Sequence, residues 1–243
     1  MSFAKILAII PTYNESGNIS KLLNGLYNLK LDVLIVDDGS TDGTIEIAKS
    51  IDTNGNEINF LLRSNKLGLG NAYRAGYAWA LENNYKTLIQ MDADGSHQIS
   101  DLENMLKYLE NHESIELVIG SRWMKGGAIE NWSKSREALS RIANKYTQLM
   151  LQLGVRDATA GFRIYNSELI KRMKVDAVKS EGYCFQIEMT KVAQSAQAII
   201  AEYPITFKER ETGSSKMSSK IVIEAMWRVT IWGLQRVFWR NSR

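Results

Sequence analysis

The first half of this chain of 243 residues alternates short apolar runs with segments of helical spacing, and this alternation limits the fold more than any other feature. Strands that are apolar on both faces and separated by helices indicate a mostly parallel central sheet flanked by helices. The predicted strands are 5–10, 33–36, 59–62, 87–91 and 117–119, and the predicted helices are 18–29, 42–51, 68–83 and 99–111. We therefore predict an α/β fold.

The pattern is looser after residue 121, but nothing in it marks a second globular domain. Helices are predicted near 136–152 and 184–196, and a strand near 198–203. We expect one globular domain over residues 1–217 and an amphipathic C-terminal helix within residues 218–243.

Three predicted strands are followed by polar turns that carry acidic residues, at 11–15, 37–44 and 92–97. Each turn taken alone is explained by an Asx turn or a helix N-cap in contact with solvent. Ligands of open α/β sheets, however, bind beyond the carboxyl ends of the strands. Three acidic turns at one edge of one sheet therefore favour a binding site.

The turn Asp92-Ala93-Asp94 has the most specific chemistry of the three. Two carboxylates one residue apart in a turn can present oxygens to one hard cation. Mg²⁺ and Mn²⁺ prefer such oxygens and often share them with substrate phosphates. We therefore predict a Mg²⁺ or Mn²⁺ site, in which the cation stabilises charge on a leaving diphosphate.

Composition excludes several other classes of protein. Cys184 is the single cysteine, so neither an intrachain disulfide nor a zinc cluster of cysteines is expected. A net charge of +3 is too small to indicate a nucleic acid partner. We expect no signal peptide and no transmembrane helix, because we find no apolar stretch of the required length.

The turns also have a recognisable sequence. They read Pro11-Thr12-Tyr13-Asn14-Glu15, Val36-Asp37-Asp38-Gly39-Ser40-Thr41-Asp42-Gly43-Thr44 and Asp92-Ala93-Asp94. Further motifs are Gly120-Ser121-Arg122, Gly126-Gly127, Trp132, Arg136, Thr159-Ala160-Gly161-Phe162-Arg163, Glu181-Gly182-Tyr183-Cys184-Phe185-Gln186-Ile187-Glu188, Pro204-Ile205, Arg210, Gly213, Ser215 and Lys216. The turns resemble those of family 2 glycosyltransferases of GT-A fold. The further motifs resemble the dolichol-phosphate (polyprenol-phosphate) mannosyltransferases within that family, over about residues 5–217.

The resemblance implies binding roles for the matching residues. The residues expected to bind the nucleotide sugar are Pro11, Tyr13, Glu15, Asp37, Asp38, Asp92, Ala93, Asp94, Arg210 and Lys216. The expected metal ligands are Asp94 first, then Asp92 and Ser96, where Ser96 stands at a position that is Gln in some relatives. The residues expected to bind the acceptor phosphate are Ser121, Arg122 and Arg136, and the expected catalytic set is Asp92, Asp94, Arg122 and Arg210.

The resemblance also implies a reaction: transfer of mannose from GDP-mannose to a dolichyl or polyprenyl monophosphate. The second pKa of a phosphomonoester lies near 6, so the acceptor oxygen is already anionic at neutral pH. A strong general base is then unnecessary, and arginines that align the phosphate carry the catalysis. We expect one inverting displacement that gives a β-mannosyl phosphoryl lipid. His97 is a candidate base, although a role in anchoring its loop is the favoured interpretation.

The C-terminal helix combines tryptophan and arginine, as interfacial helices do, so we expect a peripheral protein on the cytoplasmic face of a membrane. Trp227, Trp232 and Trp239 lie among apolar residues, with Arg228 and Arg236 at near-helical spacing. The alternatives are that this helix packs on the globular domain or binds a small membrane-anchoring subunit.

Several alternative functions stay open at this point. UDP-glucose or another nucleotide sugar would serve the same fold and acceptor. A nucleotidyltransferase also combines an α/β sheet with acidic metal ligands, but the turn 11–15 lacks the glycine-rich, basic phosphate loop of that class. A non-catalytic nucleotide-sugar-binding subunit is disfavoured by Asp92, Asp94, Arg122 and Arg210.

Overall fold

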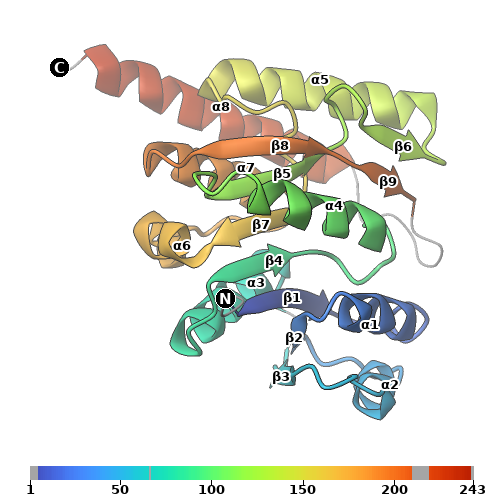
Figure 1. Ribbon diagram of the computed structural model, residues 1–243. Helices are drawn as coiled ribbons and strands as arrows, with labels where there is room; N and C mark the ends of the chain where they lie inside the picture. The colour runs from blue at the N-terminus through green and yellow to red at the C-terminus, as the bar shows by residue number, and fades with distance from the viewer. Residues whose placement is uncertain (1–4, 66, 210–218, 242–243) are drawn as a thin grey trace.

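The computed structural model describes residues 5–65, 67–209 and 219–241. A seven-stranded sheet runs through the molecule in the strand order β3-β2-β1-β4-β7-β5-β8 (Figure 1). Its strands are β1 Ile6–Thr12, β2 Asp32–Asp37, β3 Ile58–Leu62, β4 Thr87–Gln90, β5 Leu117–Ser121, β7 Arg163–Asn166 and β8 Ile200–Pro204. A separate two-stranded ribbon pairs β6 Ala128–Glu130 with β9 Thr206–Lys208.

The helices follow the strands in the predicted alternation. They are α1 Ile19–Asn28, α2 Thr44–Ser50, α3 Leu69–Glu82, α4 Ile99–Glu110, α5 Lys134–Leu151, α6 Ser167–Met173, α7 Gly182–Ser195 and α8 Ser219–Asn241, with a short 3-10 helix at Val175–Ala177. Thus the α/β class and the mostly parallel sheet are confirmed.

The strands are apolar on both faces because each face of the sheet has its own helical layer. In β1, Leu7 and Ile9 pack into one core, whereas Ala8 and Ile10 pack into the other. The first core includes residues of α3, α6 and α7, and the second includes residues of α1, α2 and α4. Helices on both faces leave the ends of the strands as the place for a site.

Strand β7 is the exception to the parallel arrangement. It lies between β4 and β5 and is antiparallel to both. The sequence did not reveal it, because its four residues begin with arginine and contain no apolar run. Arg163 is nevertheless fully buried, since backbone carbonyls accept its hydrogen bonds.

Helices α5 and α8 lie side by side beyond β8, at the top of Figure 1. Val229 of α8 is buried in the first core, and the Tyr146 and Thr230 hydroxyls are 2.6 Å apart across the pair. One face of α8 therefore packs on the globular domain, which was one of the alternatives considered for this helix. Within the described residues, we find no helix that is both long and apolar enough to span a membrane.

Candidate active site

The turns that follow β1 and β2 are locked together by hydrogen bonds in both directions. The backbone N–H of Asn14 donates to the Ser40 hydroxyl (2.9 Å), and the N–H of Thr41 donates back to the Asn14 side chain (2.9 Å). The N–H of Glu15 donates to the Thr44 hydroxyl (2.8 Å). Two turns that are far apart in sequence thus form one rigid unit.

Asp42 adds charged hydrogen bonds to this unit. Its carboxylate accepts from the N–H of Ser16 (3.0 Å) and from both the N–H (3.1 Å) and the hydroxyl of Thr44. Burial acts to raise the pKa of Asp42, but the hydrogen bonds from Thr44 and Ser16 outweigh it and lower the pKa to about 2.

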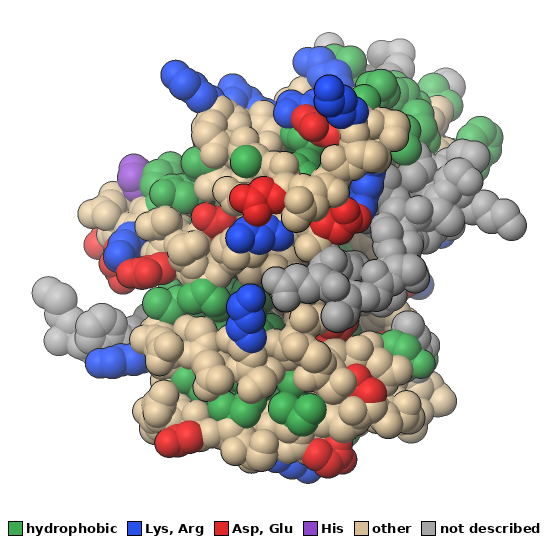
Figure 2. All heavy atoms as spheres, turned by 90° about the vertical axis from the view of Figure 1, so that its right-hand side faces the viewer, with side chains coloured by type: hydrophobic (Ala, Val, Ile, Leu, Met, Phe, Trp, Pro, Cys, Tyr) green, Lys and Arg blue, Asp and Glu red, His purple; other side chains and the backbone are tan. Residues whose placement is uncertain are grey.

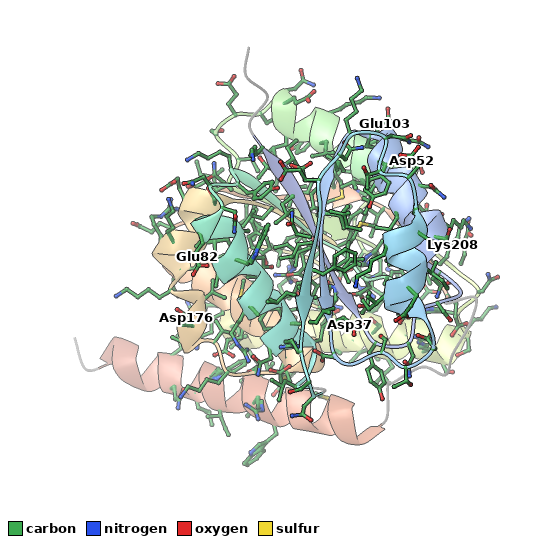
Figure 3. The ribbon with its side chains drawn as sticks, turned by 90° about the horizontal axis from the view of Figure 1, so that it is seen from below. Asp37, Asp52, Glu82, Glu103, Asp176 and Lys208 are labelled. Atoms are coloured by element: carbon green, nitrogen blue, oxygen red, sulfur yellow. The ribbon has the colours of Figure 1, made fainter. Side chains whose placement is uncertain are left out.

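Asp37, which ends β2, and Asp38, which follows it, have different surroundings. Asp37, labelled in Figure 3, accepts hydrogen bonds from Thr12, Gly39 and Ser40, so its carboxylate shapes the turn. Asp38 is buried and forms an ion pair with Arg63, at the end of β3. Both lie in the turn where a nucleoside is expected to bind, and their roles in that binding stay predictions.

Asp92 is fixed from two sides. The hydroxyl of Tyr73, a fully buried residue of α3, donates to its Oδ1 (3.0 Å). Burial and the neighbouring Asp92 charge raise the pKa of Tyr73 well above its usual value, so the phenol stays protonated and donates. The backbone N–H of Asp92 donates to Nδ1 of His97 (3.1 Å).

His97 anchors this turn. Its ring stacks on Phe162 with centroids 4.6 Å apart and an angle of 13°. Burial lowers the pKa of His97 against the opposing effect of Asp92 and Asp94, so the ring is neutral at pH 7. Since Nδ1 already accepts a hydrogen bond, the anchoring interpretation fits the structure better than a role as base.

Asp94 is nearly buried and its carboxylate is held by Ser96. The hydroxyl of Ser96 (2.6 Å) and its backbone N–H (3.1 Å) both donate to Asp94 Oδ1. Gly95 between them has a φ of 78°, a left-handed conformation that favours glycine. Ser96 thus orients the expected metal ligand, and its own role as a ligand stays a prediction.

Arg122 lies in a buried ion pair. Its Nε and Nη2 each donate to the Asp157 carboxylate at 2.7 Å, and Nη2 also donates to the Thr159 hydroxyl (2.8 Å). The rings of Trp123, Trp132 and Phe207 surround the guanidinium, whose Cζ lies 5.4–5.7 Å from their centroids. Such a bidentate, buried pair fixes the plane of the guanidinium.

The two other residues expected at the acceptor phosphate lie close by in the chain. Arg136 stacks on Trp132 at 4.0 Å and donates to Glu209, in a pair that is more exposed than that of Arg122. The Ser121 hydroxyl is fully buried, and no residue in the described parts of the chain hydrogen-bonds to it.

Strand β9 connects the acidic turn 92–97 to the arginine cluster, which is Arg122 and Arg136 around the ring of Trp132. The N–H of Lys208 donates to the carbonyl of Ser96 (3.2 Å). The Phe207 ring lies 5.8 Å from the His97 ring and 5.6 Å from the Trp132 ring. Figure 2 looks onto this edge of the molecule and shows acidic and basic side chains interspersed on it. Among the described residues, the structure thus brings the acidic turns, Arg122 and Arg136 to one edge.

The remaining predicted residues take different positions. Pro11 lies within β1, next to its last residue. Tyr13 is 37% exposed in the turn that follows, and Ala93 is buried between the two aspartates. Arg210 and Lys216 lie outside the described residues, so their expected contacts stay predictions.

Sequence reasoning missed several residues that shape the site. Tyr73 and Asp157 hold Asp92 and Arg122. Arg163 was quoted within a motif but given no role, and it binds the carbonyls of Ala158 and Ala160. Asp157 immediately precedes a quoted motif and was a detectable acid. Tyr73 has no such signal, because it lies within an ordinary helix pattern.

Comparison with known proteins places the chain among glycosyltransferases. The family model described as glycosyl transferase family 2 matches residues 7–174. A polyprenol monophosphomannose synthase of Mycolicibacterium smegmatis is 41% identical over 95% of this chain and 88% of its own length. An undecaprenyl-phosphate mannosyltransferase of Micrococcus luteus is 44% identical over 95% of this chain and 94% of its own.

Solved structures share the fold at low identity. A glucosyl-3-phosphoglycerate synthase from Mycobacterium tuberculosis, in complex with Mn²⁺ and UDP-glucose, has a TM-score of 0.66 at 17% identity, covering 97% of this chain and 79% of that one. The mannosyltransferase PcManGT from Pyrobaculum calidifontis, in complex with GDP-Man and Mn²⁺, has a TM-score of 0.60 at 17% identity, covering 96% and 64%. With its α/β sheet, acidic turns and matching family model, this chain belongs to glycosyl transferase family 2 and has a GT-A-like fold.

Proposed function

We propose that this protein transfers mannose from GDP-mannose to a dolichyl or polyprenyl monophosphate and releases a β-mannosyl phosphoryl lipid. The observation that carries the proposal is that β9 contacts both the turn of Asp94, through the carbonyl of Ser96, and the guanidinium of Arg122, through Phe207. The names of relatives that match along 95% of the chain support the lipid phosphate acceptor and the mannosyl group.

The donor binds along the turns that follow β1, β2 and β4. Tyr13, Glu15 and Asp38 contact the nucleoside on the rigid unit that Asp42 and Ser40 hold together. Asp92 and Asp94 face the sugar diphosphate. Tyr73 and Ser96 already orient these carboxylates. The two side chains therefore lose little conformational freedom when the donor binds.

The residues present fit a hard divalent cation. Asp92 and Asp94 offer oxygen ligands, as Mg²⁺ or Mn²⁺ requires, and the described residues bring no third acid, histidine or cysteine into that cluster. Phosphate oxygens of the donor would therefore share the coordination. When bound, the cation would neutralise charge on the diphosphate.

The acceptor phosphate binds at the arginine cluster. Arg122 is fixed by buried Asp157, whereas the pair of Arg136 with Glu209 is more exposed and can exchange. The lipid phosphate displaces Glu209 from Arg136, and this exchange provides a cation for a dianionic ligand. The buried hydroxyl of Ser121 is the further expected donor.

The reaction is one displacement. An oxygen of the lipid phosphate forms a bond to C1 of mannose, and the bond from C1 to the GDP oxygen breaks with its electron pair leaving on GDP. Attack opposite the leaving group inverts the α-linkage of the donor to a β-linkage. No proton is removed from the anionic acceptor, which agrees with the anchoring position of His97.

The protein meets its lipid at the cytoplasmic face of a membrane, as a peripheral enzyme. Helix α8 contributes to this contact with the exposed face that carries Trp227. A small membrane-anchoring subunit is the alternative occupant of the same helix, and nucleic acid is not a partner.

The proposal is tested with purified protein, Mn²⁺ or Mg²⁺, a short-chain polyprenyl phosphate and one nucleotide sugar at a time. We expect mannosyl lipid by mass spectrometry with GDP-mannose, and a loss of at least about 100-fold in Asp94→Ala. Asp52→Ala, an exposed aspartate in the loop before β3, is the matched control and keeps activity.

The outcomes separate the alternatives. Product with UDP-glucose instead would overturn the donor while keeping the acceptor. Donor binding without product from any donor would favour the non-catalytic nucleotide-sugar-binding subunit. Full activity of Asp94→Ala would overturn the proposed role of the acidic turn.

A further inference from the structure

We infer that α5 and α8 together form one docking surface for an anionic lipid bilayer, so that membrane contact extends beyond the C-terminal helix. This inference rests on the proposed function for its choice of occupant. The surface is called the α5–α8 face below and is defined by six exposed apolar residues. They are Leu139, Ile142, Leu149, Trp227, Ile231 and Leu234.

The apolar exposure on these helices is large. Ile142 is 63% exposed, Leu149 is 65% exposed and Trp227 is 66% exposed. Single exposed apolar residues are ordinary, but a contiguous patch on a polar surface marks an interaction site. More than half of the large exposed apolar residues in the described chain lie on these two helices, so they are concentrated there.

The helical spacing places the residues of each helix on one side. Ile142 and Leu149 are two turns apart, and Trp227, Ile231 and Leu234 follow the spacing i, i+4, i+7. On α5 the opposite side is buried, through Ser140, Asn144, Thr147 and Leu151. On α8 the opposite side is buried at Val229.

The two exposed sides adjoin each other. The seam between the helices is formed by Tyr146 with Thr230, and by Gly233 packed against Met150. At 100° per residue, each seam lies between the buried side and the exposed apolar side of its helix. The exposed sides therefore continue across the seam as one surface, on the outside of the paired helices at the top of Figure 1.

The charges around this face select the occupant. Lys145 and Arg228 are exposed, and the helical spacing places each of them next to the apolar side of its own helix. The acid of α5, Glu137, is already paired with Arg141. Basic side chains stand beside apolar ones at the top of Figure 2. An apolar face with a basic border matches the headgroups and acyl boundary of an anionic membrane, whereas the apolar flank of a partner helix needs no such border.

The α5–α8 face also begins at the candidate acceptor site. Leu139 is three residues after Arg136, which is one helical turn, and Arg141 lies 4.2 Å over the ring of Trp123. A lipid whose phosphate is held at Arg122 and Arg136 therefore has its chain directed along this face. Docking of the face on the bilayer leaves the acceptor in the membrane while its phosphate reacts.

The test compares vesicle binding of the full-length protein and variants. Vesicles of phosphatidylcholine and phosphatidylglycerol in equal parts are sedimented with wild type and with the double variant Ile142→Glu/Leu149→Glu, both changes lying on α5. Exposed helical positions tolerate glutamate, so the fold is expected to persist. Leu62→Glu is the matched control, because Leu62 is 56% exposed on β3 at the far edge of the sheet.

We expect the double variant to bind at least about tenfold more weakly and Leu62→Glu to bind as wild type. Wild-type binding should weaken in vesicles of phosphatidylcholine alone and at high salt. Equal binding of wild type and double variant, or no binding of wild type, would overturn the inference. Turnover of a water-soluble short-chain acceptor is measured in parallel, since its absence in all variants would be a failure of the proposed function instead.

Discussion

At the residue scale, the site depends on side chains that position the acids. Tyr73 is the clearest case, because its fully buried hydroxyl donates to Asp92 while its ring stacks between Phe185 and Tyr77. A hydrogen bond to a charged group contributes about 1.5–3 kcal/mol. Removal of this hydroxyl leaves the packing in place and releases Oδ1 of Asp92.

We predict that Tyr73→Phe raises the KM for the nucleotide sugar about tenfold, the change that about 1.4 kcal/mol of lost binding produces. Titration calorimetry of GDP with Mn²⁺ should show a matching loss in affinity. Tyr85→Phe, which removes a hydroxyl near Asp32 from the same kind of buried tyrosine, is the control and should bind as wild type. Wild-type affinity in Tyr73→Phe would show that Asp92 needs no positioning from α3.

The sequence predicted the acids but not the residues that hold them, for a physical reason. Asp92 and Asp94 could be found because a strand end in an open sheet is itself a functional location. The partner of each acid depends on tertiary packing: Tyr73 reaches Asp92 across a gap of 19 residues, and Asp157 reaches Arg122 across 35. Local sequence patterns give no information about contacts between residues that are so far apart in the chain.

At the element scale, four hydrogen bonds join the turns after β1 and β2, where the donor is proposed to bind. Asp42 links them through Ser16. Because its pKa is lowered in the folded protein, its stabilisation is complete above the unfolded pKa of about 3.9 and is lost as pH falls through about 2. After discounting for solvent exposure, we estimate this contribution at about 1 kcal/mol.

We predict that Asp42→Asn lowers the free energy of unfolding by about 1 kcal/mol at pH 7. The difference from wild type should narrow below pH about 4, since the Asp42 carboxylate then protonates in the unfolded chain while it stays ionised in the folded protein down to about pH 2. Urea unfolding at pH 7, 4 and 3 measures this directly. A difference that stays constant over that range would show that the charge of Asp42 contributes nothing to the lock.

The elements themselves show where pattern reasoning works. The first five predicted strands were found within two residues of their ends, because each is apolar on both faces. Strands β6 and β9 have three residues each and pair with each other. Three residues are too few to show a periodic pattern, so the sequence alone does not predict these strands. Yet β9 is the element that joins the acidic turn to the arginine cluster.

At the scale of the whole molecule, antiparallel β7 lies between the strands that carry the proposed donor turns and the strand that carries the proposed acceptor site. The donor turns follow β1, β2 and β4, and the arginine cluster follows β5, on the other side of antiparallel β7. The residues between β5 and α5 then lead from the arginine cluster to the α5–α8 face. This order agrees with the proposed function, in which the nucleotide binds away from the membrane and the lipid phosphate binds beside it.

The α5–α8 face is continuous only while α8 stays docked on α5, and Gly233 sets their approach. A Cβ at this position would lie 3.1 Å from the backbone oxygen of Met150, which cannot rotate away as a side chain can. We predict that Gly233→Val costs about 1–3 kcal/mol of helix packing. Amide exchange in residues 219–241 should accelerate, exchange in β1 and β4 should not change, and vesicle binding should fall.

Gly154→Ala is the control, because a Cβ there meets nothing within 4 Å. Because the site lies on the sheet and not on α8, turnover of a water-soluble acceptor should persist in Gly233→Val. Unchanged exchange in α8 would mean that contacts other than this seam hold the helix, and the face would then survive the substitution intact.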